Sequence, residues 1–457
     1  MKSGTKQFAY EQVYQRIKEA ILTGTLSSGD RIPSSRALAV DMGVSRGTVE
    51  EGYSRLKSEG YIESNGKSGT KVSANLHTID VEVHQYSPLQ SLSQSKFDCE
   101  IPFKLGIPAM DCFPRKVWSK TIAKCARETK VIDLYQKNPQ GILDLRIAIA
   151  RYLQMSKGIQ CKPHQIFITT GYINSINWIV QALLRNNSKV VIEDPGYPLT
   201  RKLLRSNGLV PEPTELDMEG LIIPPDGSFS AVIVTPAHQS PTCIALSLRR
   251  RKDLLKWATR NEAWIIEDDY DGDFCNGQHN NPALKSLDVN NRVIYMGTFS
   301  KVLCPSLRLA YFVVPEYKVE TFLNIADLHS NNVSEFTQRA VTLFMIEGHF
   351  YRHIQRMKEV YRVRRMFTLK VLKSILNEVS VIHPDGGMNI TLLLSLNKCT
   401  DVELSKYLLK KGLHVEPLSS WSTSEKKQGI IISYANIENE DECNKLVVKI
   451  KDVLQAL

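Results

Sequence analysis

The sequence lacks any long apolar segment. None of its 457 residues belongs to an uninterrupted run of about 18 or more uncharged apolar residues, the length that a membrane-spanning helix needs. Its opening residues, Met-Lys-Ser-Gly-Thr-Lys-Gln, also lack the apolar core of a secretory signal peptide. We therefore expect a soluble protein that stays in the cytoplasm.

The sequence also lacks closely paired cysteines. Its nine cysteines are scattered singly, without the short spacings of zinc sites or disulfide-rich domains. We expect reduced thiols and no metal. The composition, 42% hydrophobic and 23% charged, is that of a globular chain long enough for two or three domains with separate cores.

A strong charge bias is missing at the N-terminus. The whole chain has a net charge of +10, but its first 76 residues carry 11 basic and 8 acidic side chains. This balance allows an anionic partner without identifying one. The nature of this partner is therefore indicated by sequence motifs and not by charge.

The first 76 residues predict a helical domain. Val13, Ile17 and Ile21 recur every four residues, which indicates an amphipathic helix over 10–23. A second, short helix is expected over 38–42, because proline and serine residues precede it and a glycine follows it.

A third helix is expected after Ser45, which is placed to cap it. Val49, Tyr53 and Leu56 have helical spacing and face inward, so the N-terminal end stays exposed, as in a recognition helix. The segment 61–72 predicts two short strands around a glycine-rich turn. A plain three-helix bundle with a hairpin would give the same spacing.

The amino-acid sequence of this region is more specific than the spacing of its apolar residues. It reads GDRIPSSRALAVDMGVSRGTVEEGYSRLKSEGYIES and then GKSGTKV, which resembles the winged helix-turn-helix of GntR-type transcription regulators. The resemblance implies operator DNA as a partner, with phosphate and base contacts from Arg36 and Arg46. The residues that it implies as supporting contacts to the DNA backbone are Ser35, Thr48, Lys67 and Thr70.

A serine- and glutamine-rich stretch over 77–97 lacks sustained periodicity, which indicates a linker between a domain over 1–76 and a larger one over 98–457. In the larger part, helical stretches alternate with short apolar strands. These strands are expected over 165–169, 189–193, 231–235, 264–268 and 292–297. The alternation predicts an α/β fold with a mainly parallel sheet.

Two motifs near strand ends, IIEDDYDGDF and YMGTFSKVLCPSLRLAY, place Asp268 and Lys301 33 residues apart. Together with TTGYINS, EDPGYP, HQSPT, LGIPAMDCFPRKVW and NPQGILDLRIAIARYL, they resemble fold-type I pyridoxal-phosphate aminotransferases. More closely, the chain resembles the MocR subfamily of GntR regulators. The resemblance covers nearly all of the chain after the linker. It implies pyridoxal phosphate as cofactor and a smaller α+β domain after the large one.

The resemblance also implies residue roles. Lys301 would form the Schiff base with the cofactor aldehyde, unless it is an ordinary surface lysine after a strand. Asp268 would face the pyridine nitrogen, with Glu267 and Asp269 as the alternatives. Tyr270 would bond to the phenolic oxygen of the ring, unless it is a core tyrosine.

The cofactor phosphate needs cations and dense hydrogen-bond donors, which Arg308 can supply in a bidentate manner. The other implied phosphate ligands are Thr298, Ser300 and the backbone N–H groups of Gly171 and Tyr172. Tyr197 would stack on the ring, although a turn tyrosine would look the same. Tyr135 resembles the tyrosine that family dimers donate to the neighbouring subunit's phosphate. A homodimer is therefore expected, with the DNA-binding domain of one chain packed on the large domain of the other.

The sequence departs from the aminotransferase pattern at three positions. Ile431 stands where an R-x-x-x-A segment has the arginine that holds the substrate carboxylate. Ser240 stands where aminotransferases have asparagine, and Cys243 replaces a glycine. Transamination of ordinary amino acids becomes doubtful, unless another cation such as Arg201 supplies the clamp.

Two functions compete. The first is a regulator of amino-acid or vitamin B6 metabolism genes, whose signal is pyridoxal phosphate itself or a ligand without an α-carboxylate. The second is a working aminotransferase with an appended DNA-binding domain. A cofactor-free repressor would require Lys301 to be incidental.

Overall fold

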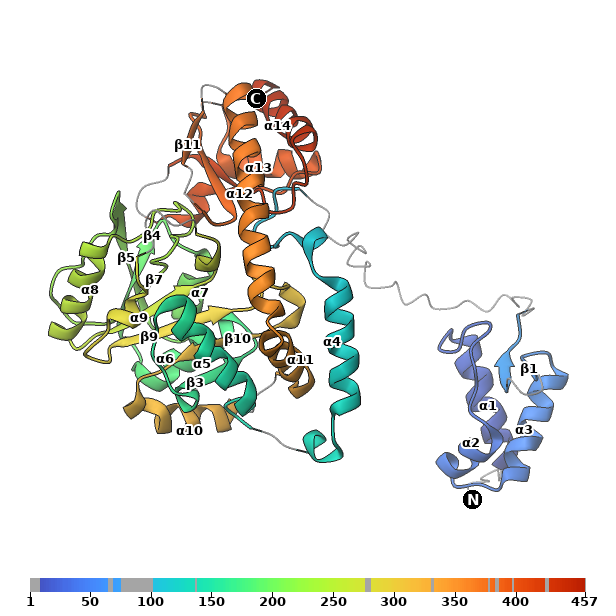
Figure 1. Ribbon diagram of the computed structural model, residues 1–457. Helices are drawn as coiled ribbons and strands as arrows, with labels where there is room; N and C mark the ends of the chain where they lie inside the picture. The colour runs from blue at the N-terminus through green and yellow to red at the C-terminus, as the bar shows by residue number, and fades with distance from the viewer. Residues whose placement is uncertain are drawn as a thin grey trace, which may run out of the picture. The chain divides into compact units, whose positions relative to one another are not determined.

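A computed structural model describes residues 9–64, 69–74, 102–135, 138–275, 281–329, 333–376, 379–382, 386–396, 398–423 and 427–456. The chain divides into two compact units between Phe97 and Asp98, and each is described by itself (Figure 1). The expected linker over 77–97 lies outside the described residues. In the described parts of the chain, no helix is long and apolar enough to cross a membrane.

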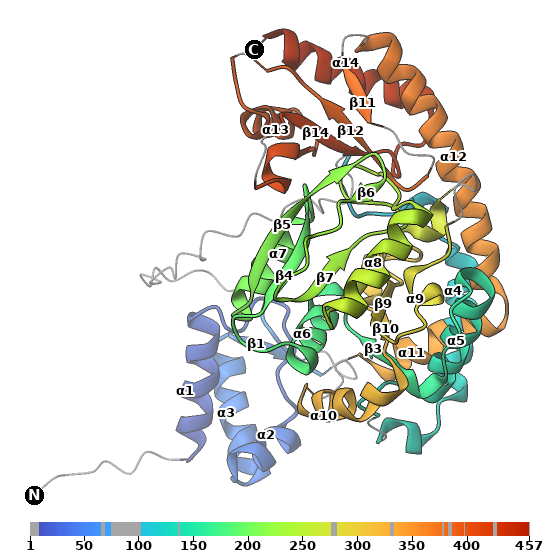
Figure 2. The ribbon, with the colours of Figure 1, turned by 90° about the vertical axis from the view of Figure 1, so that its left-hand side faces the viewer.

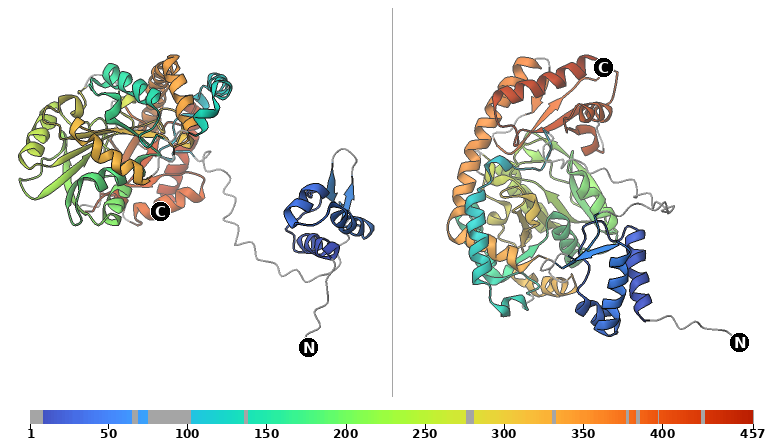
Figure 3. Two further views of the ribbon diagram at one scale, coloured as in Figure 1. Left: turned by 90° about the horizontal axis from the view of Figure 1, so that it is seen from below. Right: turned by 90° about the vertical axis from the view of Figure 1, so that its right-hand side faces the viewer.

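The N-terminal unit holds three helices and a hairpin. Its elements are α1 (Ala9–Leu22), α2 (Ser35–Met42), α3 (Arg46–Ser58), β1 (Ile62–Ser64) and β2 (Thr70–Val72). The Ser34 hydroxyl accepts from the Ala37 N–H at the start of α2, and Ser45 accepts from the Thr48 N–H at the start of α3. Gly43 ends α2 with φ +65°. The helices bury one shared apolar core, and the antiparallel hairpin projects beside them (Figure 3).

The large lobe of the second unit is built on a mainly parallel sheet. Its strands are β3 (Ile166–Thr169), β4 (Lys189–Asp194), β5 (Val210–Asp217), β6 (Gly220–Leu221), β7 (Phe229–Val234), β8 (Trp264–Asp269), β9 (Val293–Thr298) and β10 (Ala310–Val313). The described strands are ordered β3-β10-β9-β8-β7-β4-β5-β6. Strands β5, β4, β7, β8 and β9 run parallel, whereas β10 and β6 are antiparallel to their neighbours.

Helices cover both faces of this sheet. The helices of this lobe are α4 (Arg115–Glu128), α5 (Leu143–Lys157), α6 (Tyr172–Leu183), α7 (Pro198–Ser206), α8 (Leu248–Arg260), α9 (Leu284–Leu287), α10 (Val319–His329) and α11 (Glu335–Ile346). On β4, Val190 and Ile192 pack in the cluster with α6, α7 and α10, whereas Val191 packs in the cluster with α8 and α9. Because successive side chains point to opposite faces, a strand covered on both sides must be apolar throughout.

The small lobe is an antiparallel sheet with helices on it. Its elements are α12 (His349–Ile375), β11 (Ser380–Ile382), β12 (Asn389–Leu393), α13 (Asp401–Lys410), β13 (Glu416–Pro417), β14 (Gly429–Ser433) and α14 (Glu440–Ala456), with the strands ordered β11-β12-β14-β13. The 27-residue helix α12 runs along both lobes (Figure 2). Short 3-10 helices span Met110–Cys112, Val131–Leu134, Pro163–Gln165, Gly272–Phe274, Pro305–Leu307, Glu316–Lys318 and Leu418–Trp421.

The fold expected from the sequence is confirmed: a mainly parallel α/β lobe is followed by a smaller α+β lobe. Since β10 is antiparallel to both β3 and β9, strands β3, β4, β7, β8 and β9 all point the same way. Their carboxyl ends therefore meet at one edge, where open α/β sheets place their ligands.

Candidate functional site

The loops after these strand ends carry the residues singled out in the sequence. Lys301 lies three residues beyond β9, and Asp268 lies at the end of β8, paired in register with Met296. Gly171 follows β3 and Tyr197 follows β4. The parallel sheet therefore brings together segments that are far apart in the sequence.

Lys301 is a largely buried amine. Its Nζ donates to the carbonyl oxygen of Gly106 at 2.8 Å. Burial lowers the pKa of Lys301, and the carboxylates of Asp271 and Asp268 only partly oppose this. A lowered pKa increases the fraction of unprotonated amine, which is the nucleophilic form.

Gly106 makes room for this amine. Its φ is +84°, and a Cβ at this position would lie 2.6 Å from Lys301 Nζ. Sequence reasoning missed this role, although Gly106 belongs to the LGIPAM string that carries the family resemblance.

Asp268 is a carboxyl without a partner. No hydrogen bond or ion pair to it is found among the described residues, and burial raises its pKa to about 8, helped by the nearby carboxylates of Asp269 and Glu193. Lys301 acts in the opposite direction. A ligand that carries a protonated ring nitrogen would supply the missing cation, so the site fits the group that the sequence implies.

The two alternative carboxylates are already occupied. Glu267 accepts from the backbone N–H groups of Leu284 and Lys285, each at 2.8 Å, at the start of α9. Asp269 lies 2.8 Å from Lys157 Nζ and accepts from the Tyr295 hydroxyl at 2.6 Å. Of the three neighbours on β8, Asp268 is therefore the one that remains available to a ligand.

Three aromatic side chains line the same edge. The Tyr172 hydroxyl lies 2.6 Å from Thr200 Oγ1, and the Tyr172 and Tyr197 rings are 5.9 Å apart. Tyr197 in turn lies 5.6 Å from the ring of Trp421. These contacts fix Tyr197 at the mouth of the site, where it is 45% exposed. Trp421 has no counterpart among the residues that the sequence singled out.

A candidate phosphate cradle lies at the start of α6. A Cβ on Gly171 would lie 3.6 Å from Arg308 Nη2, so the guanidinium lies against this backbone. Thr298 Oγ1 accepts from the Ser300 N–H at 3.1 Å, which shapes the turn before Lys301. A guanidinium beside the first N–H groups of a helix is suited to an anion.

Tyr135 follows the 3-10 helix Val131–Leu134 and is 77% exposed. Among the described residues, no hydrogen bond or ring contact joins it to the residues named above. Its expected role toward the neighbouring subunit stays a prediction.

The position expected to hold a substrate carboxylate is apolar. Ile431, on β14, is 1% exposed and packs in a cluster with Leu418 and Trp421. Leu105, which precedes Gly106, packs against this cluster. The alternative cation, Arg201, donates to the carbonyl oxygen of Ser420 at 3.4 Å. Its guanidinium thus contacts the loop that holds Trp421.

The two lobes are hydrogen-bonded beside the site. The Asp194 carboxylate accepts from the Thr423 N–H at 2.9 Å and from its hydroxyl at 2.7 Å. Gly196 donates its N–H to the carbonyl oxygen of Trp421 at 3.0 Å. The loop with Tyr197 is therefore tied to the small lobe, a link that no motif in the sequence predicts.

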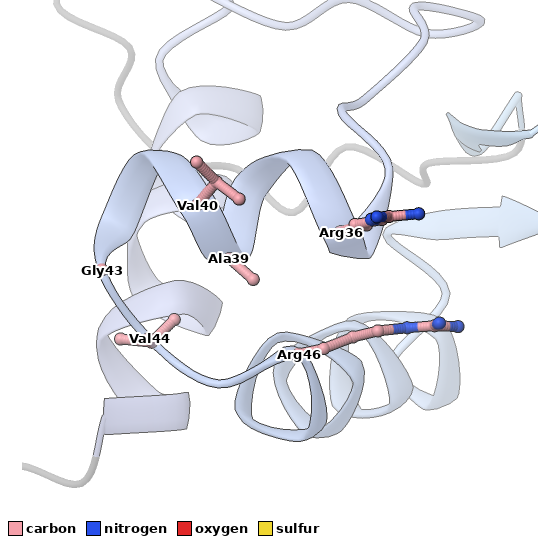
Figure 4. Close-up of a pocket in the computed structure, with 6 residues that line it drawn as sticks. All are labelled: Arg36, Ala39, Val40, Gly43, Val44 and Arg46. Atoms are coloured by element: carbon pink, nitrogen blue, oxygen red, sulfur yellow. The ribbon is translucent and has the colours of Figure 1, made fainter.

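A second candidate site lies on the N-terminal unit. Arg36 on α2 and Arg46 on α3 line one shallow pocket and extend in the same direction (Figure 4). Val40, also in this pocket, is 78% exposed. Two arginine side chains that extend in the same direction from neighbouring helices are suited to a phosphate backbone and base edges.

The other expected DNA contacts have different surroundings. Thr48 Oγ1 lies 2.8 Å from the Ser45 hydroxyl in the N-terminal cap of α3. Ser35 donates to Glu50 Oε1 at 3.3 Å, and Arg46 Nε donates to the same oxygen at 2.7 Å. Glu50 was not singled out in the sequence, yet it bridges α2 and α3. Thr70 lies on β2, and Lys67 lies outside the described residues.

Comparisons with known proteins agree with both parts of the chain. Residues 9–72 match the bacterial regulatory proteins of the gntR family, and residues 101–450 match aminotransferase class I and II. The chain is 33% identical over 441 residues to the HTH-type transcriptional regulator YhdI of Bacillus subtilis, covering 94% of this chain and 93% of that protein.

Two further relatives have more informative names. The chain is 32% identical to the probable rhizopine catabolism regulatory protein MocR of Rhizobium meliloti, covering 94% of this chain and 90% of that protein. It is 29% identical to the pyridoxine biosynthesis regulator PdxR of Corynebacterium glutamicum, covering 97% and 95%. Among solved structures, an archaeal alanine:glyoxylate aminotransferase has a TM-score of 0.72 at 21% identity, over 78% of this chain and 91% of that one. This last similarity supports the fold alone.

Proposed function

The chain belongs to the MocR subfamily of GntR-type transcription regulators, in which a winged helix-turn-helix precedes an aminotransferase class I and II domain. From this membership we propose that it binds pyridoxal phosphate at Lys301 and uses the occupancy of that site to control its binding to operator DNA.

The observation that carries the proposal is the proximity of Lys301 to Asp268. A largely buried amine with a lowered pKa lies close enough to an unpartnered carboxyl for each to influence the titration of the other. Pyridoxal phosphate offers an aldehyde for the amine and a basic ring nitrogen for the carboxyl. Burial of an amine and of a carboxyl destabilises the ligand-free site. A ligand that pairs with both groups removes this destabilisation, which favours its binding.

Other residues would orient the bound group. Arg308 and the first N–H groups of α6 would hold its phosphate, and Tyr197 would cover one ring face. Tyr270 would donate to the phenolic oxygen. When bound, the cofactor supplies an electron-accepting ring and a carbonyl carbon that reacts with amines.

We further propose that the signal is pyridoxal phosphate itself or a ligand without an α-carboxylate. Ile431 and its apolar neighbours supply neither charge nor hydrogen bonds to a carboxylate, and a carboxylate buried against them would lack compensation. The names of two relatives refer to pyridoxine biosynthesis and to rhizopine catabolism. We propose target genes in vitamin B6 or amino-acid metabolism, and the name that refers to pyridoxine biosynthesis supports the first of these.

A working aminotransferase with an appended DNA-binding domain is the second candidate. It is favoured by the set of Lys301, Asp268, Tyr270 and Arg308 at one sheet edge. It is opposed by Ile431, because transamination of an ordinary amino acid requires its carboxylate to be held during proton transfer.

We also propose that the active form is a homodimer, with Tyr135 directed to the partner's cofactor. The exposure of Tyr135, 77%, leaves its side chain available to a second chain and supports the arrangement. Sedimentation equilibrium would measure the oligomeric state, and a monomer at operator-binding concentrations would contradict it.

One titration separates these functions. Operator affinity is measured for cofactor-free protein, then with pyridoxal phosphate alone, then with a panel of amino acids added at saturation. The regulator proposal expects pyridoxal phosphate alone to change the affinity by about 5- to 150-fold, with the reciprocal change in cofactor affinity. A response only to amino acids, together with multiple turnovers, would favour the aminotransferase.

A further inference from the structure

A histidine on the loop that follows β7 contacts the Tyr270 hydroxyl. His238 is 3% exposed, and its Nδ1 is 3.0 Å from the Tyr270 hydroxyl and 3.1 Å from Asp271 Oδ2. Asp271 is 1% exposed. With Tyr270, these two side chains form a chain of contacts, and the function proposed above uses neither His238 nor Asp271.

The packing fixes the imidazole in place. A Cβ on Gly387, from the small lobe, would lie 2.2 Å from Cε1 of His238, so the glycine backbone lies directly on the ring. The other titratable groups beside the ring are the thiols of Cys243 and Cys275. Among the described residues, Asp271 is therefore the one full charge that faces the imidazole at contact distance.

The charge of Asp271 decides the protonation state of His238. Burial by itself lowers the pKa of this imidazole, but the Asp271 carboxylate and the neighbouring thiol of Cys243 raise it well above its ordinary value. A carboxylate that is 1% exposed requires a counter-charge, and the imidazolium is the cation in contact with it.

Protonated Nδ1 restricts what Tyr270 can do. A nitrogen that carries a hydrogen cannot accept one, so the Tyr270 hydroxyl cannot donate to His238 and must direct its hydrogen elsewhere. With a neutral ring and an Nδ1 lone pair, the same 3.0 Å contact would capture this hydrogen.

We propose that His238, held charged by Asp271, is a positioning residue that directs the Tyr270 hydroxyl toward the phenolic oxygen of the cofactor. The inference rests on the proposed function. It also accounts for a departure from the aminotransferase pattern, because Ser240 replaces the asparagine of that motif and leaves Tyr270 as the implied donor to this oxygen.

The first test needs no cofactor and no substitution. In cofactor-free protein, the ¹⁵N chemical shifts of the His238 ring are measured between pH 6 and 9. We expect both ring nitrogens to carry hydrogen at neutral pH. A neutral imidazole at pH 7 would overturn the inference, whether or not Lys301 binds a cofactor.

The second test uses the visible band of cofactor-loaded protein. A hydrogen bond from Tyr270 stabilises the deprotonated phenolic oxygen, so its loss should raise the pH midpoint of the spectral change by about one to two units. The double variant His238→Gln/Asp271→Asn keeps the net charge of the pair and gives Tyr270 an amide oxygen to donate to. We expect it to raise the midpoint by about as much as Tyr270→Phe does.

Combining the changes separates positioning from a general structural effect. In the Tyr270→Phe background, the double variant should shift the midpoint no further. Cys275→Ala, which alters packing beside the same ring, should leave the midpoint unchanged. Equal shifts with and without the Tyr270 hydroxyl, or no shift at all, would overturn the inference. Absence of any lysine-linked band in wild-type protein would instead contradict the proposed function.

Discussion

The Nζ of Lys301 donates to the carbonyl oxygen of Gly106 at 2.8 Å, although 195 residues separate them in the chain. The positive φ of Gly106 and the lack of a Cβ allow this contact. An unprotonated amine keeps two hydrogens and one lone pair, so the carbonyl can hold one hydrogen while the lone pair stays free to react.

Replacement of Lys301 tests the attachment site. Lys301→Ala should lack the visible chromophore that borohydride fixes to the protein, because Lys301 is the amine whose charge acts on the Asp268 carboxyl. Absorption before and after reduction, with peptide mapping, is the measurement. Lys256→Ala, on the exposed side of α8, should keep the chromophore. A fixed adduct on another lysine of the Lys301→Ala protein would refute the assignment.

Replacement of Gly106 tests the space beside the amine. Gly106→Ala should weaken cofactor binding, because its Cβ would lie 2.6 Å from Lys301 Nζ. Gly412→Ala is a matched control, since Gly412 has a similar φ of +78° but no atom within 4 Å of the added Cβ. Both changes should cost about 1–2 kcal/mol in unfolding free energy, but only the first should change cofactor affinity. Equal affinities in equilibrium dialysis would contradict the expectation.

Replacement of the paired arginines tests the DNA interface. In Arg36→Ala/Arg46→Ala, each lost phosphate contact should reduce the salt dependence of operator binding by about one unit of slope, and a lost base contact should cost about 1–3 kcal/mol in discrimination. Fluorescence anisotropy at several salt concentrations measures both. Lys57→Ala, at the opposite end of α3, should leave the salt dependence and the sequence discrimination nearly unchanged. Unchanged affinity and slope in the double variant would exclude these contacts.

Replacement of Ile431 tests the missing carboxylate clamp. Ile431→Arg should lower the melting temperature of the cofactor-loaded protein, because it buries a charge within an apolar cluster. Added amino acids should restore part of this loss by pairing their carboxylate with the guanidinium. Ile431→Met, of similar length but neutral, should show no such rescue. Identical melting shifts for the two variants would argue against this position as the clamp.

Replacement of Asp268 should remove one contribution to the pH dependence of stability. Its pKa of about 8 in the folded, cofactor-free protein exceeds the unfolded value of about 3.9. The folded state therefore binds the extra proton between these values, and the stabilisation present at low pH is lost as pH rises toward 8. An asparagine at this position does not titrate, so the variant Asp268→Asn lacks this loss. Its free energy of unfolding relative to wild type should therefore rise between pH 5 and pH 8 by an amount on the order of a few kcal/mol.

Urea unfolding of the two cofactor-free proteins at pH 5, 6.5 and 8 provides the measurement. Wild type should regain the advantage when pyridoxal phosphate is added, because the ring nitrogen then pairs with the carboxylate. A stability difference that does not change with pH would show that Asp268 is charged throughout.

The sequence by itself determined the local structure and the family. Apolar residues at helical spacing and serine caps specified α1 to α3, and uninterrupted apolar runs specified the buried strands β4, β7, β8 and β9. These features depend on neighbours within one element, so they can be read along the chain. The motif order likewise placed Lys301 and Asp268 at strand ends.

Only the tertiary structure decided which distant groups meet. Gly106 beside Lys301, His238 between Tyr270 and Asp271, and the apolar surroundings of Ile431 join segments from both lobes or from separate strand ends. Such contacts follow from how parallel strands and the small lobe are packed together, and no spacing along the chain encodes them. The burial that raises the pKa of Asp268, and the contact with Asp271 that raises the pKa of His238, also exist only after that packing.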